Sequence, residues 1–276
     1  RIMSTDIGHR VVERRGLLVV SIMLATLMQA LDTTIANVAL PHMQGSLSAT
    51  QDQVSWVLTS YIVAAAIAMP ATGWLATVLG RRRLMLIAIA GFTVASVLCG
   101  IAASIEQMVA FRLLQGLFGA SLVPLSQSTL LDVYPRERHG AAMAMWGMGV
   151  MIGPILGPPL GGWLTDHYSW HWVFLINVPI GALALFGVAT SLPLDETRAS
   201  RFDLRGFLFL TIGIGALQLL LDRGEQADWF ASNEIRIEAA LAFLGFYLYA
   251  VHWRFRPDAF LDLGLFRDRN FLASNV

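Results

Sequence analysis

The chain has 276 residues, of which 56% are hydrophobic and 14% are charged, and its mean hydropathy is +0.61. Because a soluble domain carries about 25% charged residues, this composition excludes an ordinary water-soluble domain and predicts an all-α polytopic membrane protein. The net charge is zero, which gives no reason to expect a nucleic-acid partner. Cys99 is the only cysteine, so the sequence predicts neither an intramolecular disulfide nor a cysteine-based metal site.

Eight apolar runs follow one another along the chain, and each is long enough to cross a bilayer, which takes about 20 residues. The first is too long for a signal peptide and has no small-residue cleavage site after it, so we expect a retained helix. A ninth run begins at Phe271, so we expect the protein to continue beyond Val276. The expected spans are 17–40, 54–79, 84–104, 107–131, 141–164, 172–192, 204–222 and 235–255.

The polar stretch from Pro193 to Asp203 separates six of these runs from the last two. We therefore expect a six-helix bundle over residues 1–192 and a cytoplasmic linker over 193–203. Two additional transmembrane helices would follow over 204–255, and residues 256–276 would hold a cytoplasmic segment and the start of the next helix.

The arginines predict the orientation of the chain in the membrane. If the N-terminus is cytoplasmic, 16 of the 19 arginines fall on the cytoplasmic side and two on the outer side, while Arg112 lies within a helix. The positive-inside rule therefore predicts a multi-pass protein with a cytoplasmic N-terminus.

Two charged side chains lie inside the predicted spans at similar depth. At 1.5 Å per residue, Asp32 lies roughly 12 Å and Arg112 roughly 8 Å below the same outer end. Each charge is costly in the membrane alone, and pairing offsets part of that cost. We predict that the two side chains pair and couple transport to protons, because the proton affinity of a buried acid depends on its solvation and on a nearby cation. The alternative is a permanent structural ion pair.

Other residues of the same spans are candidates for a substrate pocket. Some are amides within the membrane, and others are soft or flat apolar side chains that tolerate ligands of varied shape. Each amide could instead form an interhelical hydrogen bond, and most of the apolar side chains could belong to the core or face lipid. The candidates are Gln29, Asn37, Gln115, Met28, Tyr61 and Trp146.

The fifth span carries a stripe of small residues that includes Gly149, Gly153 and Gly157, with Pro154 beside it. A four-residue spacing puts these glycines on one helix face, where another helix can approach closely. We interpret the stripe as a surface against which a second bundle rocks, and tight static packing is the alternative.

The turn between the second and third spans holds three consecutive arginines. Such a cluster suits helix termini or anionic lipid headgroups, and it is also typical of a simple topology anchor. The conformational-switch candidates in this turn are Gly73, Gly80, Arg81 and Arg82.

The sequence contains no Walker loop, no nucleophile elbow and no metal-ligand spacing among its histidines. It therefore predicts that the chain is not an enzyme and needs no cofactor or metal.

Together these segments resemble the major facilitator superfamily and, within it, the 14-helix drug:proton antiporters. Residues 31–41 are similar to that subfamily's helix-1 motif, and 112–120 to the helix-4 motif, whose arginine is associated with proton transfer. Residues 149–162 and 170–181 resemble two further signatures, and 221–230 more narrowly resemble the EmrB branch. Residues 73–83 resemble the loop 2–3 motif, although that motif has an acid where Thr77 stands and a base where Val78 stands.

The resemblance implies proton-driven efflux of hydrophobic drugs across the bacterial inner membrane, with H+ as the coupling ion. The EmrB-like features imply an EmrA-like periplasmic adaptor and a TolC-like outer-membrane channel as partners. The family also has a second six-helix bundle, and residues 1–276 alone should not transport because the substrate site lies between the two bundles. Two alternatives stay open, namely an exporter of one metabolite or siderophore and a non-transporting membrane scaffold.

Overall fold

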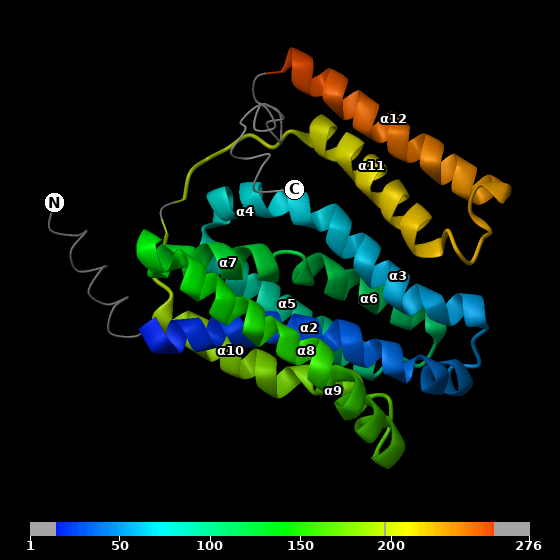
Figure 1. Ribbon diagram of the computed structural model, residues 1–276, viewed down its shortest axis with the longest axis horizontal. Helices are drawn as coiled ribbons and strands as arrows, with labels where there is room; N and C mark the ends of the chain where they lie inside the picture. Colours follow the sequence, from blue (N-terminus) through cyan, green and yellow to red (C-terminus); the bar gives the residue numbers. More distant parts are fainter. Residues whose placement is uncertain (1–14, 196, 257–276) are drawn as a thin grey trace, which may run out of the picture. The chain divides into compact units, whose positions relative to one another are not determined.

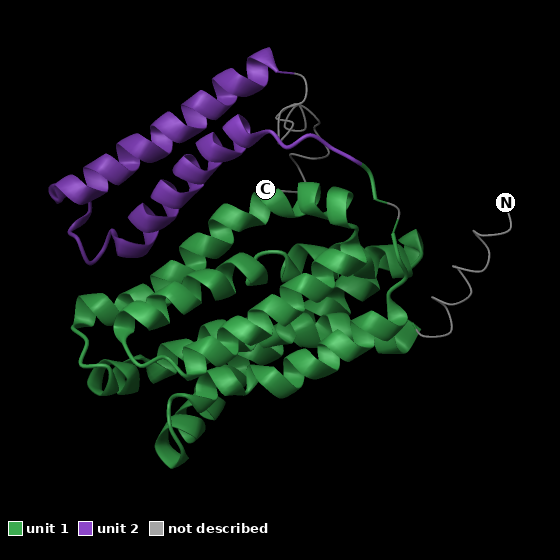
Figure 2. Cartoon of the chain, turned by 180° about the vertical axis from the view of Figure 1, so that it is seen from behind, with its two compact units in different colours: residues 1–198 green, residues 199–276 purple. Residues whose placement is uncertain are grey.

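The computed structural model describes residues 15–195 and 197–256, and this part of the chain is built of α-helices and short 3-10 helices (Figure 1). The chain divides into two compact units, Arg1–Arg198 and Ala199–Val276 (Figure 2). The boundary between the units falls inside the linker expected over residues 193–203. The expectations for the arginines before residue 15 and for the apolar run at Phe271 lie outside the described residues.

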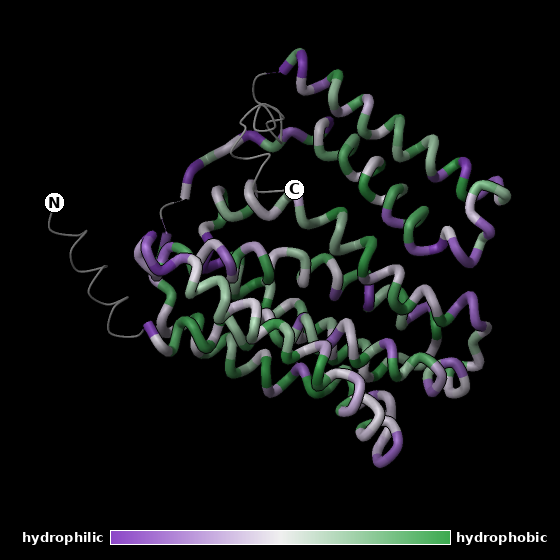
Figure 3. The backbone as a smooth tube through the Cα atoms, in the orientation of Figure 1, coloured by the Kyte–Doolittle hydropathy of each residue, from purple (hydrophilic) through white to green (hydrophobic). Residues whose placement is uncertain are grey.

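Eight helical segments of the described chain are long and apolar enough to cross a membrane, which confirms the eight expected spans. Most residues along these helices are hydrophobic, and hydrophilic residues gather at the helix ends and turns (Figure 3). The spans of unit 1 are α2 (Arg15–Ser46), α3 with η1 and α4 (Gln51–Ala68, Met69–Ala71, Thr72–Leu79), α5 (Arg81–Gly100), α6 with α7 (Ile105–Gly119, Leu122–Val133), α8 (His139–His167) after η2 (Arg136–Arg138), and α9 with α10 (Trp172–Leu175, Asn177–Ser191). The described residues of unit 2 form α11 (Leu204–Arg223), η3 (Trp229–Ala231) and α12 (Asn233–Phe255).

Local sequence signals set several of the helix ends. Thr50 and Gln53 form a capping box at the start of α3, in which each side chain binds the other's backbone N–H. The hydroxyl of Ser104 accepts from the backbone N–H of Gln107 at the start of α6. Gly80 joins α4 to α5 with a φ of 83°, a left-handed conformation in which a side chain would be strained.

Helix α2 holds unit 1 together, because it packs along α8, α10, α7 and α3. A second set of contacts joins α3 to α6, and α5 to α6 and α10. The buried apolar residues of α2 up to Met28 belong to one apolar cluster, and those from Leu31 onward belong to another. Asp32 therefore enters the core close to the boundary between two apolar clusters.

The glycine stripe of α8 faces α2 within the same unit. A Cβ added at Gly153 would lie 2.7 Å from the Cβ of Ala30, and one added at Gly157 would collide with Thr34. The hydroxyl of Thr34 also donates to the carbonyl of Gly153 across this contact, at 3.3 Å. The stripe thus provides the close packing that was the alternative interpretation, and its role in rocking against a second bundle stays a prediction.

Unit 2 is a helical hairpin whose two helices also meet at glycines. A Cβ added at Gly245 of α12 would lie 2.7 Å from the Cα of Gly213 on α11. Where α11 begins and α12 ends, the carboxylate of Asp203 accepts from the backbone N–H of Gly206 at 3.1 Å and lies 2.8 Å from the Nε2 of His252.

Candidate functional site

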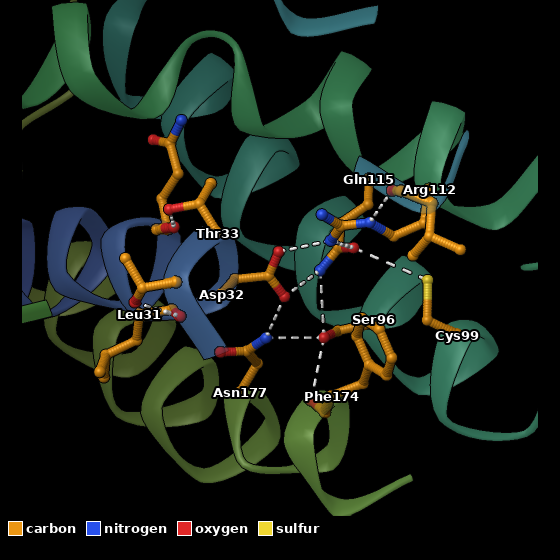
Figure 4. A network of polar contacts seen from close by, with 12 residues as sticks. Leu31, Asp32, Thr33, Ser96, Cys99, Arg112, Gln115, Phe174 and Asn177 are labelled. Carbon is orange, nitrogen blue, oxygen red and sulfur yellow. Dashed lines mark hydrogen bonds and ion pairs between the residues drawn. The ribbon is translucent and has the colours of Figure 1, made fainter. Parts of the chain in front are cut away.

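An ion pair between Asp32 and Arg112 lies at the centre of unit 1. Arg112 on α6 donates from Nη1 to Oδ2 of Asp32 on α2 at 2.6 Å, and both side chains are completely buried (Figure 4). The structure therefore confirms that the two charges meet, as their similar depth in the predicted spans indicated. A buried pair of this kind persists only where further polar contacts hold both partners.

Arg112 is held on three sides besides its contact with the acid. Its Nε donates to the carbonyl of Val57 on α3 at 2.9 Å, and its Nη1 also donates to Oε1 of Gln115 at 2.6 Å. The guanidinium carbon lies 4.3 Å from the centre of the Tyr61 ring, which is a cation–π contact. These contacts hold the guanidinium beside the acid.

Two amides bind the second oxygen of the acid. Oδ1 of Asp32 accepts from Nε2 of Gln115 and from Nδ2 of Asn177, each at 2.8 Å. Both amide nitrogens also donate to the hydroxyl of Ser96, which in turn donates to the carbonyl of Phe174 at 2.9 Å. The network therefore joins α2, α5, α6, α9 and α10 through one carboxylate (Figure 4).

The predicted pocket residues divide into enclosed and accessible side chains. Met28 and Gln115 are fully buried, and Tyr61 is 3% exposed beneath Arg112, so these three lie inside the bundle. Gln29 is half-buried and Asn37 is exposed on α2, two helical turns apart.

Trp146 on α8 is half-buried, and its Nε1 has no hydrogen-bond partner in the described part of the chain. Of the six candidates, only Gln29, Asn37 and Trp146 reach the surface of unit 1, and a role for any of the six in a pocket stays a prediction.

The arginine turn is tied to other elements of unit 1. Arg81 pairs with Asp132 at the end of α7, and the guanidinium of Arg82 donates from Nη2 to the carbonyl of Ala189 on α10 at 2.6 Å. Gly73 is exposed with open space around it, whereas Gly80 is buried. Arg81 and Arg82 therefore do more than mark the topology, because both bind other helices at this end of the bundle.

A carboxylate from outside the turn binds the start of α5. Asp195, which follows α10, accepts from the backbone N–H of Arg82 at 3.2 Å and so caps the first turn of α5. Nearby, the backbone N–H of Arg198 donates to the carbonyl of Thr77 at 3.0 Å. The segment after α10 thus packs on the arginine turn, although Thr77 itself carries no charge.

Sequence reasoning missed Ser96 and Asn177 as site residues, and it also missed the two acids that meet the arginine turn. A usable signal existed for the first two. At 1.5 Å per residue, Ser96 lies roughly 12 Å and Asn177 roughly 8 Å from the outer ends of their predicted spans, the same depth as Asp32 and Arg112.

Comparison with known proteins places the chain in a family. The sequence profile of the Major Facilitator Superfamily matches residues 22–263. The chain is 43% identical over 258 residues to the multidrug export protein EmrB of Escherichia coli K12, covering 92% of this chain and 50% of that protein. It is 44% identical over 259 residues to the fatty acid resistance protein FarB of Neisseria gonorrhoeae, covering 93% and 51%. The chain thus spans about half the length of the curated relatives it matches.

Solved structures agree on the fold. A crystal structure of the peptide transporter POT in complex with sulfate superposes with a TM-score of 0.64 at 17% sequence identity. The match covers 87% of this chain and 52% of that transporter. At this level of identity the likeness concerns the arrangement of the helices and not the ligand.

Proposed function

This chain belongs to the major facilitator superfamily, a family of transporters rather than enzymes, and on that premise we propose that the protein containing it exports hydrophobic compounds in exchange for protons. The names of relatives, multidrug export protein and fatty acid resistance protein, support substrates that are apolar or amphipathic and varied in shape. In this proposal H+ is the coupling ion and no cofactor takes part.

The observation that carries the proposal is the complete burial of Asp32 and Arg112 in a pair whose hydrogen bonds extend to α3, α5, α9 and α10. A charge buried in a membrane protein is expensive, so such residues generally mark ion or proton pathways. The anionic form of Asp32 is suited to this conformation, because every side chain that contacts its carboxylate donates a hydrogen bond.

Protonation of Asp32 would remove the charge that compensates Arg112. Breaking a buried pair by neutralising one partner costs about 3–5 kcal/mol. That is comparable with the roughly 5.5 kcal/mol that moves a two-state equilibrium from 1:99 to 99:1. Protonation at this site would therefore destabilise the paired conformation by a large part of that amount, and Arg112 would control when the proton is bound.

The accessible polar face of α2 is the proposed substrate contact within unit 1. Gln29 and Asn37 lie on one side of the helix that carries Asp32, three residues before it and five residues after it. A substrate bound against this face would be sensitive to movement of the same helix that holds the proton site. The remaining part of the pocket would come from the second bundle of the full-length transporter.

We also place the transporter in the inner membrane of a bacterium with its N-terminus in the cytoplasm, as the distribution of arginines supports. An EmrA-like adaptor and a TolC-like outer-membrane channel are the proposed partners, because relatives named EmrB resemble the chain over 92% of its length. Co-purification of the full-length protein with a periplasmic adaptor tests this part of the proposal, and isolation without one under mild extraction would count against it.

Asp32→Asn in the full-length transporter tests the proton site. The amide keeps the volume of the carboxylate but cannot exchange a proton, so we expect drug resistance to be lost while expression persists. Asp52→Asn is the matched control, since Asp52 is an exposed acid in the first turn of α3 and should tolerate the change. Drug resistance and metabolite export that are both unchanged in Asp32→Asn would remove Asp32 from the mechanism. Loss of export of one metabolite, with no change in resistance to any drug, would favour the exporter of a single compound.

A further inference from the structure

The carboxylate of Asp32 is surrounded by donors alone, which poses a problem once it is protonated. Oδ2 faces Nη1 of Arg112, and Oδ1 faces the amide nitrogens of Gln115 and Asn177. A protonated carboxyl is itself a donor and needs an acceptor. A buried donor left without a partner is costly, so the site needs an oxygen that can accept a hydrogen bond from the protonated carboxyl.

The acceptors close to Asp32 differ in how far they are already used. The hydroxyl oxygen of Ser96 accepts from two amides, at 2.8 Å from Asn177 and 3.2 Å from Gln115. Oε1 of Gln115 accepts from Arg112 at 2.6 Å and lies 3.7 Å from the thiol of Cys99. Oδ1 of Asn177 is different, because it is buried and has no hydrogen-bond partner among the described residues.

A rotation of the Asn177 side-chain amide exchanges the positions of its nitrogen and oxygen. In Figure 4 the nitrogen of Asn177 points toward Asp32 and Ser96, and its oxygen points to the opposite side. Rotated by half a turn, the same side chain would present Oδ1 to the acid and accept a hydrogen bond from the protonated carboxyl. Gln115 cannot do this without loss, since rotation would turn its N–H groups toward the guanidinium of Arg112.

We infer that Asn177 is a positioning residue for the proton step, with an amide that donates to Asp32 when the acid is ionised and accepts from it when the acid is protonated. This inference rests on the proposed function, because it assumes that Asp32 exchanges a proton. The proton itself moves to and from Asp32, and no covalent bond of Asn177 changes.

The surroundings of Asp32 leave few other groups to take this role. The titratable groups that face it are Arg112 on α6, Tyr61 on α3 and Cys99 on α5. The faces of α8 and α10 that pack against α2 carry none in the described chain. Asn177 is the first residue of α10, so its amide joins the start of that helix to Asp32 on α2.

Infrared difference spectroscopy of the full-length transporter in lipid, recorded across a pH titration, tests the inference. The carbonyl band of protonated Asp32 is identified by its disappearance in Asp32→Asn. In Asn177→Leu the protonated carboxyl loses its acceptor, so we expect the band to shift to higher frequency. In Asn177→Asp an acceptor is always present and the two carboxyls share a proton, so a protonated band should persist at every pH at which the parent releases it. This second variant carries the test if the leucine variant does not fold.

Ser96→Ala is the matched control, because Ser96 touches the amides but not the acid, and it should leave the band in place. An Asp32 band that titrates and keeps the parent frequency in Asn177→Leu would overturn the inference and leave the proposed function standing. An equal shift in Ser96→Ala and Asn177→Leu would also overturn it, since loss of the network would then explain both. Absence of any band that depends on Asp32 would overturn the proposed function itself, and this inference with it.

Discussion

A double-mutant cycle on Asp32 and Arg112 measures how strongly the buried pair depends on both partners. Arg112→Leu leaves a fully buried carboxylate with two amide donors and no compensating charge, and Asp32→Asn leaves the guanidinium with the Val57 carbonyl, the Gln115 oxygen and the Tyr61 ring. Leaving one buried charge without its partner costs about 3–5 kcal/mol, whereas removing both charges is often close to neutral. We therefore expect each single variant to be destabilised by several kcal/mol and the double variant to recover about 3 kcal/mol of the summed loss.

The assay is the free energy of unfolding of the full-length protein in lipid bicelles, measured at constant pH for the four members of the cycle. The pair of Arg81 and Asp132 provides a matched control, because it joins the same side-chain types with 40% and 59% of their surface exposed. Exposed pairs contribute about 0–1 kcal/mol, so that cycle should show little coupling. Additive losses at Asp32 and Arg112, or equal coupling in the two cycles, would refute the reasoning that burial gives this pair its dependence on charge.

Three further outcomes follow from local geometry. Gly153→Val should lower the free energy of unfolding by about 1–3 kcal/mol, because the new side chain meets Ala30 on α2. Gly162→Val on the same helix is the control, since its side chain points into open space and should cost far less. Equal losses would contradict the packing described for the stripe. Asp195→Ala removes the cap from the first turn of α5 and should raise amide hydrogen exchange there about five-fold, for a cost of about 1 kcal/mol, whereas unchanged exchange would show that the cap is not formed. Partial burial lowers the pKa of His171, so the unfolded chain takes up a proton at a higher pH than the folded chain does. The free energy of unfolding should therefore fall as the pH drops through the usual histidine range, at about 6.5. An NMR titration of His171 in the folded protein should give a pKa below that value, and a raised pKa would contradict the assignment.

The spans and the central ion pair were predictable because both follow from position along the helix axis. The length of each apolar run determines where a helix crosses the membrane, and the rise per residue then places Asp32 and Arg112 at one depth. Their partners Ser96 and Asn177 lie at the same depth but were not identified. Helices that are apolar all round give no signal for which side faces the neighbouring helix, so depth alone does not pair two neutral polar side chains.

The helix that the glycine stripe of α8 contacts could not be predicted from the sequence either. The spacing of Gly149, Gly153 and Gly157 predicts a close helix contact, and that contact exists, but the spacing does not name the partner. In unit 1 the partner is α2, the helix that carries Asp32. The acid at the arginine turn was beyond prediction for a different reason, because Asp195 lies in a segment without regular structure, whose path depends on tertiary contacts.

Proton exchange at Asp32 during transport is measured most directly as substrate-driven proton movement in liposomes containing the full-length transporter. We expect a substrate gradient to drive protons in the opposite direction in the parent protein, and to drive none in Asp32→Asn, which should still exchange substrate for substrate. Proton movement in Asp32→Asn at the parent's rate would contradict the account.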